Sequence, residues 1–310
     1  MQAGRKWLQC ALPAALLLTL ASIADAQERY ARGQDVVPVF EGWERNPDGT
    51  VNMVFGYMNR NYEEEMDIPV GPDNMIAPGP ADQGQPAHFY PRRQEFVFKV
   101  KVPKDWGEND LIWTLRSAGK TEKAYGSLMP IWEIGNLMYQ ENRKGAGDVT
   151  YPEEPNQAPS IEMVGSARRT VAVGGALTLS VEVSDDGHPI PRSRAGRAGR
   201  PAADNLPDSP KPQSPLTQAV VKLDPGVRLG VTWVLYRGGS GTVTFNPMRV
   251  PVVKAGPPGV AQAAGPLEGR AATTAIFSQA GIYVLRAYAD DGVLTTPVEV
   301  TVTVEDAAKH

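Results

Sequence analysis

The sequence predicts an all-β protein built from two β-sandwich domains, and three observations lead to this expectation. Short stretches alternate apolar and polar side chains, as strands with one buried face do; residues 94–102 and 177–183 are the clearest examples. Turn sequences such as Asn46-Pro-Asp-Gly49 separate these stretches. No long segment has the 3.6-residue period of an amphipathic helix, which favours sandwiches over mixed folds.

The first 26 residues have the features of a cleaved secretory signal peptide. Arg5 and Lys6 precede an apolar run at 11–21, and Ala24-Asp25-Ala26 is a small-x-small cleavage site. The apolar run is too short to span a membrane as a helix. We therefore expect an extracytoplasmic protein, periplasmic or secreted, without membrane insertion.

Composition argues against several functional classes. The chain carries 31 basic and 35 acidic side chains, a formal net charge of −4, which provides no basic footprint for nucleic acid. Its single cysteine, Cys10, lies within the predicted signal peptide, so the mature chain has no thiol for catalysis or metal binding. His88, His188 and His310 lack neighbouring ligands at the spacing of a zinc site. We expect no cofactor and no catalytic residues.

The distribution of proline, glycine and charge divides the chain. A first domain is expected at 37–140, and a linker at 141–159, where three prolines fall within the last nine residues. A second domain is expected at 160–305. Within it, 189–225 combines arginines and prolines with almost no apolar residues, so we expect a disordered insertion there.

The end of the chain is the most informative part of the second domain. Two alternating stretches, 281–289 and 297–304, flank Asp290-Asp-Gly292 and predict an antiparallel pair. Gly281, Tyr283 and Leu285 have the spacing of a tyrosine corner, in which a tyrosine hydroxyl bonds back to the preceding backbone.

A series of motifs occurs in a fixed order along the second domain. They are Asn156-Gln-Ala-Pro159, Asp185-Asp-Gly187, Val231-Thr-Trp233, Gly241-Thr-Val-Thr-Phe245, Ala275-Ile-Phe277, Gly281-Ile-Tyr-Val-Leu285 and Ala289-Asp-Asp-Gly292. Through these motifs, residues 156–305 resemble the PKD-like (polycystic kidney disease type) immunoglobulin-like domains of secreted bacterial proteins. The resemblance implies that Leu179 and Leu285 face one another with Trp233 packed across them, and it supplies no catalytic residues. The insertion at 189–225 departs from the pattern of the family.

Aromatic and amide side chains of the first domain form the first candidate site. Trp106 lies in a predicted turn, and Tyr62 is close in sequence to Asn59 and Asn61. Stacking rings with nearby amides are suited to sugar rings, so these four residues are candidates for a carbohydrate platform. The alternative is that the rings simply pack in a core.

Two acidic pairs of the second domain form the second candidate site. Asp185 and Asp186, and likewise Asp290 and Asp291, come at strand ends and offer carboxylates to calcium. The alternative is that Asp-Gly is simply good turn chemistry.

Together these observations predict a secreted or periplasmic, non-catalytic binding or adhesion-type accessory protein with a carbohydrate or protein partner. One alternative is a structural spacer that docks on a partner protein, which an exposed apolar patch on the first domain would favour. A second is a hydrolase with two carboxylates, since such pairs leave no sequence signature.

Overall fold

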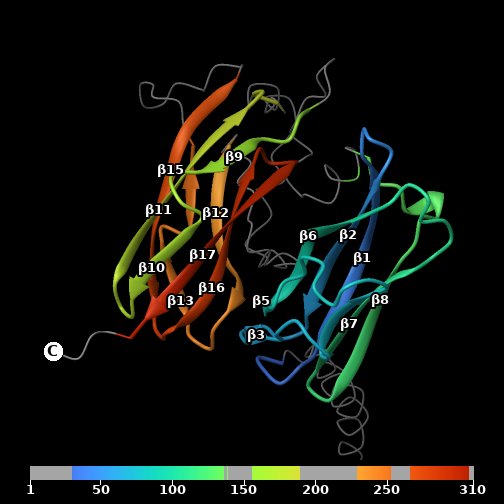
Figure 1. Ribbon diagram of the computed structural model, residues 1–310, viewed down its shortest axis with the longest axis horizontal. Helices are drawn as coiled ribbons and strands as arrows, with labels where there is room; N and C mark the ends of the chain where they lie inside the picture. Colours follow the sequence, from blue (N-terminus) through green and yellow to red (C-terminus); the bar gives the residue numbers. More distant parts are fainter. Residues whose placement is uncertain (1–29, 136–137, 139–155, 189–228, 253–265, 307–310) are drawn as a thin grey trace, which may run out of the picture.

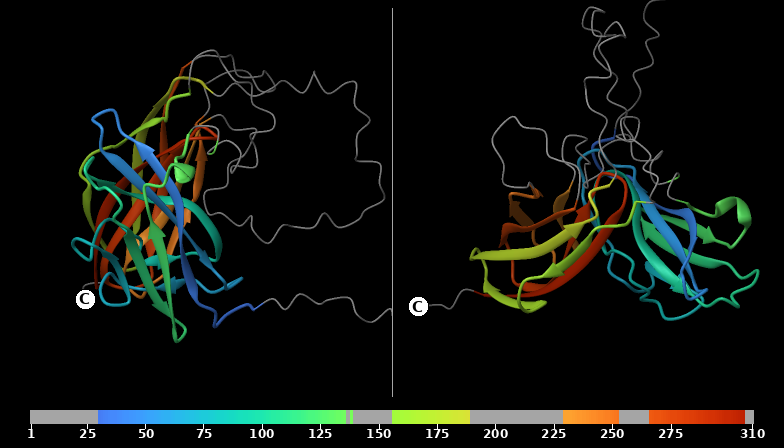
Figure 2. Two further views of the ribbon diagram at one scale, coloured as in Figure 1. Left: turned by 90° about the vertical axis from the view of Figure 1, so that its right-hand side faces the viewer. Right: turned by 90° about the horizontal axis from the view of Figure 1, so that it is seen from above.

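The computed structural model describes residues 30–135, 138, 156–188, 229–252 and 266–306. The predicted signal peptide, the predicted insertion and most of the predicted linker lie outside these residues. Within them the protein is all-β, as predicted, with strands β1 to β17 and one 3-10 turn, η2 (Pro130–Trp132). The strands form two lobes side by side (Figure 1), which diverge in a V when seen from above (Figure 2). In this part of the chain, no helix has the length and apolar character needed to cross a membrane.

The first lobe is a sandwich of two three-stranded antiparallel sheets. Its core contains Phe55, Phe98 and Trp113, with the Trp113 ring edge-on to both phenylalanines at 6.0 and 4.9 Å between centroids. Trp113 belongs to β7 and the phenylalanines to β2 and β6, so this contact joins the two sheets. One sheet has the order β1 (Val36–Arg45), β2 (Val51–Asn59), β6 (Arg92–Val102); the other has the order β4 (Asn74–Ala77), β7 (Leu111–Ser117), β8 (Lys120–Gly126). A two-stranded ribbon, β3 (Met66–Asp67) with β5 (His88–Phe89), completes the lobe.

A wide bulge interrupts β6 on the side of the second lobe. Residues 95–97 lie opposite the single residue Gly56 of β2. Phe96 has a φ of 52°, in the left-handed region that few non-glycine residues adopt. A Cβ on Gly56 would approach the carbonyl oxygen of Gln94 to 2.4 Å, so glycine is required opposite the bulge. The regular alternation of 94–102 gave no indication of this irregularity.

The second lobe is an immunoglobulin-like sandwich of a five-stranded and a four-stranded sheet. β10 runs parallel to β17, and the other pairs are antiparallel. The first sheet has the order β10 (Arg168–Ala172), β17 (Thr295–Glu305), β16 (Gly281–Asp290), β12 (Gly230–Gly238), β14 (Arg249–Pro251). The second has the order β13 (Val243–Asn246), β15 (Leu267–Phe277), β11 (Ala176–Asp185), β9 (Ser160–Met163).

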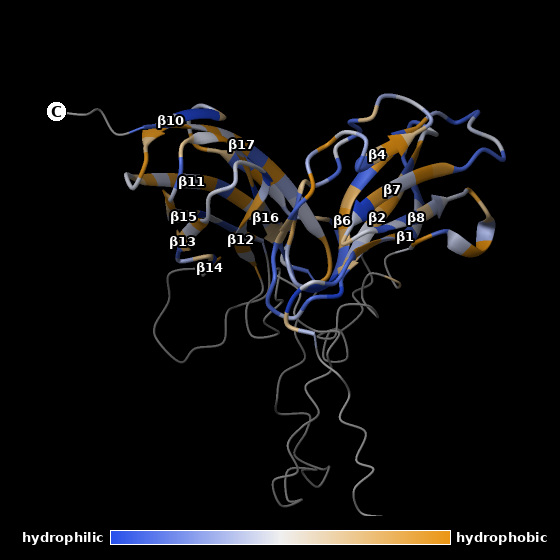
Figure 3. Cartoon of the chain, turned by 90° about the horizontal axis from the view of Figure 1, so that it is seen from below, coloured by the Kyte–Doolittle hydropathy of each residue, from blue (hydrophilic) through white to orange (hydrophobic). Residues whose placement is uncertain are grey.

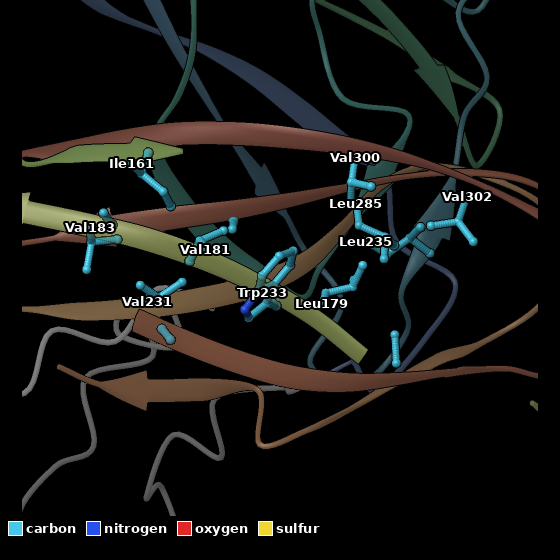
Figure 4. Close-up of a cluster of buried hydrophobic side chains, with 14 of the residues drawn as sticks. Ile161, Leu179, Val181, Val183, Val231, Trp233, Leu235, Leu285, Val300 and Val302 are labelled. Atoms are coloured by element: carbon cyan, nitrogen blue, oxygen red, sulfur yellow. The ribbon is translucent and has the colours of Figure 1, made fainter. Parts of the chain in front are cut away.

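The core of this sandwich contains the three residues that the resemblance places there. Leu179, Trp233 and Leu285 are fully buried in one cluster between the sheets (Figure 4). The tyrosine corner is also present, because Tyr283 Oη donates a hydrogen bond to the carbonyl of Gln279 at 2.9 Å. This bond fixes the turn that leads from β15 into β16.

Candidate functional site

The amides predicted for a sugar platform face the interior of the first lobe. Asn59 and Asn61 are fully buried. The Asn59 amide donates to the carbonyls of Glu64 (2.8 Å) and Phe89 (3.0 Å). The Asn61 amide donates to the carbonyl of Gln34 at 2.8 Å, and its Oδ1 accepts the backbone N–H of Gln34 at 2.6 Å. Both side chains therefore hold the loop that follows β2 instead of presenting amides to solvent.

The two aromatic candidates lie at opposite ends of the first lobe. The half-buried Tyr62 follows the last residue of β2 by three positions and carries the Arg92 guanidinium over its ring at 4.0 Å. Trp106 follows β6 at the other end of the sheet, about 26 Å away at ~3.3 Å per strand residue. It is half-buried against the core, and its indole N–H donates to the carbonyl of Asn109 at 2.7 Å. The structure therefore does not bring Trp106 together with Tyr62, Asn59 and Asn61.

The first lobe instead exposes an apolar run on η2, which we call the 129–132 segment. Its residues Met129, Pro130, Ile131 and Trp132 are all exposed, with exposed fractions of 57% for Met129, 83% for Ile131 and 46% for Trp132. η2 contacts β1, and Figure 3 draws its coil at the outer side of the first lobe with part of it in the orange of hydrophobic residues. Four consecutive exposed apolar residues are rare in a soluble protein unless they have a function.

The backbone of the 129–132 segment is fixed to β1. The indole N–H of Trp43 donates to the Met129 carbonyl at 2.9 Å, and the N–H of Ile134 donates to the Trp43 carbonyl at 2.8 Å. Beside the segment, Glu133 pairs with Arg45 at 2.8 Å. These bonds hold the main chain, so the apolar side chains project from a defined base.

The second notable region is the junction between the lobes, whose centre is the buried Arg286 of β16. Its guanidinium lies 3.3 Å from the centre of the Tyr236 ring and donates to the carbonyl of Val97 at 3.1 Å. Tyr288 Oη donates to the same carbonyl at 3.1 Å, and Glu299 forms an ion pair with Arg286. The β6 bulge thus places Val97 where two side chains of the second lobe bind it.

The edge of β12 forms the polar side of the junction. The Ala87 N–H donates to the carbonyl of Tyr236 at 3.0 Å, and the Leu235 N–H donates to Tyr90 Oη at 2.9 Å. Arg237 forms two 2.9 Å bonds with Asp82. β14 pairs with the first three residues of β12, and the first lobe bonds to the backbone of the same strand further along, at Leu235 and Tyr236.

An apolar cluster forms another part of the junction. It joins residues of the first lobe to the turn between β16 and β17. Its members are Val54, Phe96, Ile134, Val293 and Leu294.

His88 of the β3–β5 ribbon lies beside the junction, next to Tyr90. It is 6% exposed, with Nδ1 2.8 Å from Asp67 Oδ1 and Nε2 3.2 Å from Glu65 Oε2, and it packs edge-on to Tyr90. Burial opposes its protonation, but the bonds to Asp67 and Glu65 outweigh burial and raise the pKa of His88 to about 8. Among the described residues, no group of three or more His, Cys, Asp or Glu side chains is placed to hold a metal ion.

The four acidic candidates of the second lobe have different environments. Asp290 is fully buried against Arg249, with bonds of 2.6 and 3.1 Å, so its charge is neutralised. Asp186 accepts the backbone N–H groups of the residues at 157 and 188, which ties a surface turn. Asp185 and Asp291 are both buried, and Asp291 accepts a hydrogen bond from Asn156 at 3.0 Å. The structure therefore does not gather the four carboxylates at one site, and the side-chain partner of Asp291 is Asn156.

An open pocket of about 370 Å³ lies on the first lobe beside the β3–β5 ribbon. It is lined by residues 66–73, Arg116 and Ser117. Each of its two carboxylates has a basic neighbour, since Asp67 bonds to His88 and Asp73 lies 3.9 Å from Arg116.

Comparison with known proteins gives little beyond the fold. No protein-family model matches the chain, and no curated protein matches its sequence. Among solved structures, a chimeric titin Z1Z2 functionalized with a KLER exogenous peptide from decorin is 9% identical over 89% of this chain and 100% of that chain, with a TM-score of 0.19. A protein of unknown function from Porphyromonas gingivalis W83 is 9% identical over 87% and 98%, with a TM-score of 0.22. Dpr2 Ig1-Ig2, in complex with DIP-Theta Ig1-Ig3, is 11% identical over 87% and 100%, with a TM-score of 0.20.

These likenesses are too weak to carry an argument about function. The immunoglobulin-like assignment depends on the strand order of the second lobe and on its tyrosine corner. Fold and site together define an all-β protein with an immunoglobulin-like lobe and a fixed apolar segment on its other lobe.

Proposed function

We propose that this chain is a non-catalytic, extracytoplasmic binding protein that docks on a partner protein through the 129–132 segment. The observation that carries the proposal is the exposure of four consecutive apolar residues on a backbone fixed by Trp43. The proposed extracytoplasmic location, periplasmic or secreted, depends on the predicted signal peptide. The resemblance of residues 156–305 to PKD-like domains of secreted bacterial proteins supports an accessory role.

The chemistry of the segment favours a protein partner over a sugar. Within the segment, Ile131 and Met129 are more exposed than Trp132, and aliphatic side chains gain energy by entering an apolar pocket. Trp132 is held edge-on by Phe40 at 6.0 Å between centroids and adds an aromatic anchor of the kind common in protein interfaces. Asn59 and Asn61, the amides expected to orient a sugar, are buried at another site.

Site-specific photocrosslinking tests this function in the native host. We would place a photoreactive amino acid at Ile131, at Trp132 and at Ile282. Ile282 is a matched control, because it is 64% exposed but lies on the other lobe. We expect one discrete adduct with the same protein from Ile131 and Trp132, and none from Ile282.

Three outcomes would contradict the proposal. Equal adducts from all three positions would show non-specific stickiness, and no adduct would leave the segment without a protein partner in that host. An adduct that consists of two copies of this chain would instead make the segment a self-association surface.

A further inference from the structure

The first lobe holds the edge of β12 through two hydrogen bonds, and a buried histidine lies between them. The Ala87 N–H donates to the carbonyl of Tyr236 at 3.0 Å, and Tyr90 Oη accepts the N–H of Leu235 at 2.9 Å. His88 lies between Ala87 and Tyr90 in the chain and is 6% exposed. A movement of the backbone at His88 would therefore reach both bonds.

Both ring nitrogens of His88 face carboxylates. Nδ1 lies 2.8 Å from Asp67 Oδ1, and Nε2 lies 3.2 Å from Glu65 Oε2. A neutral imidazole carries a proton on only one nitrogen, so its other nitrogen would turn a lone pair toward a carboxylate oxygen. The imidazolium carries a proton on both nitrogens and suits both neighbours. The geometry of the cluster thus calls for a charged His88.

The ribbon that carries His88 is short and is fixed at one end. β3 and β5 pair through two residues each, Met66 with Phe89 and Asp67 with His88. Phe89 is fully buried in the core of the first lobe. Asp67 contacts His88 through both the backbone pairing and its side chain, so this contact holds the other end of the ribbon, next to Ala87.

Neutral tyrosines connect His88 to the second lobe. The Tyr90 ring packs edge-on to the His88 ring at 4.7 Å between centroids, and the Tyr90 N–H donates to Tyr57 Oη at 2.9 Å. Burial raises the pKa of Tyr57, Tyr90 and Tyr236, so all three stay neutral in the pH range where a histidine titrates. The charges that face the His88 ring are therefore those of Asp67 and Glu65.

Other charged groups of the junction lie on the second lobe. Arg286 pairs with Glu299 and bonds to Tyr288 Oη, and its guanidinium stays charged at any pH of interest. Burial raises the pKa of Asp291 to about 7, and this carboxylate accepts the N–H of Val293 in the turn between β16 and β17. Asp291 is the group whose titration has to be separated from that of the histidine.

We propose that protonated His88 is a clamp that couples the two lobes, and that loss of its proton loosens the hold of the first lobe on β12. Without the proton, one carboxylate faces a bare nitrogen. Glu65 has the longer contact and a side chain that is 49% exposed, so it turns away into water while Asp67 keeps its bond to Nδ1. The ring is then held from one side, and the bonds of Ala87 and Tyr90 to β12 open more often.

The direction of the pH effect follows from the folded state. Burial opposes the charge of His88, but the contacts with Asp67 and Glu65 outweigh burial and raise its pKa from 6.5 to about 8. The clamp is therefore fully closed below pH ~6.5 and is released as the pH rises through 8. If opening frees His88 from both carboxylates, the opening equilibrium of the junction rises by up to about 30-fold over this range.

Hydrogen–deuterium exchange of the full-length mature chain between pH ~6 and ~9 tests the clamp. With the intrinsic rate at each pH divided out, the amides of Ala87 and Leu235 should lose protection by up to about 30-fold. The Val173 amide is the internal control, because it bonds to the Glu305 carbonyl beside β10, at the opposite edge of the sheet from the junction. In addition, ¹⁵N NMR of the His88 ring should show a proton on both nitrogens at pH ~7.

Glu65→Gln separates the histidine from Asp291. It removes one of the two facing charges, so the pKa of His88 should fall and the loss of protection should move to lower pH. Glu63→Gln is the matched control, since it makes the same change at an exposed position two residues earlier and should leave the transition unmoved. If Asp291 caused the release, both variants would keep the midpoint of the wild type, and that result would overturn the proposal.

His88→Gln removes the titrating group itself. Its Ala87 and Leu235 amides should have low protection at every pH, because a neutral amide side chain cannot act as the charged clamp. Glu65→Gln decides the matter if His88→Gln does not fold, because Glu65 is half exposed and its replacement leaves the core intact. A wild type in which Ala87 and Leu235 follow Val173 at all pH values, or a single protonated nitrogen at pH ~7, would refute the clamp.

Discussion

The first lobe has two surfaces of opposite chemistry, and only one of them is covered by the chain itself. The junction with the second lobe is rich in hydrogen bonds, with Arg286 and Tyr288 bonding to the Val97 carbonyl. The 129–132 segment is apolar and exposed, with Ile131 83% accessible. The covered surface has directional hydrogen bonds at its centre, which require the two lobes to meet in one orientation. The uncovered surface has the apolar chemistry of a site that is covered by another molecule.

The largest expected effect comes from breaking the junction at Arg286. Arg286→Met removes the guanidinium from the Tyr236 ring and leaves Glu299 without its partner. We expect a loss of about 3 kcal/mol in the free energy of unfolding, at the lower end for buried pairs because Glu299 is half exposed to water. Urea unfolding followed by fluorescence and by circular dichroism measures this loss, and separate transitions would show that the lobes have uncoupled.

The control for Arg286 is an ion pair outside the junction. Arg270→Met breaks the pair with Glu182, in which both side chains are more than half exposed, so its effect should be below about 1 kcal/mol. If the two variants had the same free energy of unfolding, the Arg286 pair at the junction would contribute no more to stability than an exposed ion pair does.

A smaller effect is expected from the titration of His88 in the β3–β5 ribbon next to the junction. Its pKa is raised from 6.5 to about 8 in the folded state, so its contribution is fully present below pH ~6.5 and is lost as the pH rises through 8. The shift corresponds to about 2 kcal/mol. His88→Gln should flatten the dependence of unfolding free energy on pH between 6 and 9, as measured by urea unfolding.

Two acidic groups and one tyrosine face His88, and Asp291 titrates in a similar pH range. Asp67, Glu65 and Tyr90 surround the ring. Asp291 also has a raised pKa, and its stabilising contribution is lost as the pH rises through about 7. Both losses have the same sign, so only the difference between wild type and His88→Gln isolates the histidine. Parallel curves for the two proteins would show that His88 does not contribute.

Local patterns were sufficient to predict the all-β class and several of the strands. The alternation in 177–183 and the spacing of Gly281, Tyr283 and Leu285 depend on neighbours in sequence, so β11 and the tyrosine corner were predictable. The bulge at 95–97 was not, because its cause is the close approach of β2 at Gly56.

The chemistry of the sites depended on partners far away in the chain. Asn59 is buried because its amide bonds to Phe89, 30 residues later, and nothing in its own neighbourhood indicates this. Asp290 and Asp291 look equivalent in sequence, but Arg249 pairs with one of them alone. The exposed apolar run could not be predicted either, because four adjacent apolar residues do not show whether they face a core or solvent.

The smallest expected effect on stability is the one that most sharpens the contrast between the two surfaces. Ile131→Ser changes a side chain that is already 83% exposed, while the hydrogen bond from Trp43 to the Met129 carbonyl remains. We expect the free energy of unfolding to change by less than about 0.5 kcal/mol, measured by urea unfolding. A loss above ~1.5 kcal/mol would show that Ile131 packs within the folded chain, and the segment would then be part of the core and not a docking surface. Unchanged stability with loss of the Trp132 crosslink would assign the residue to a partner alone.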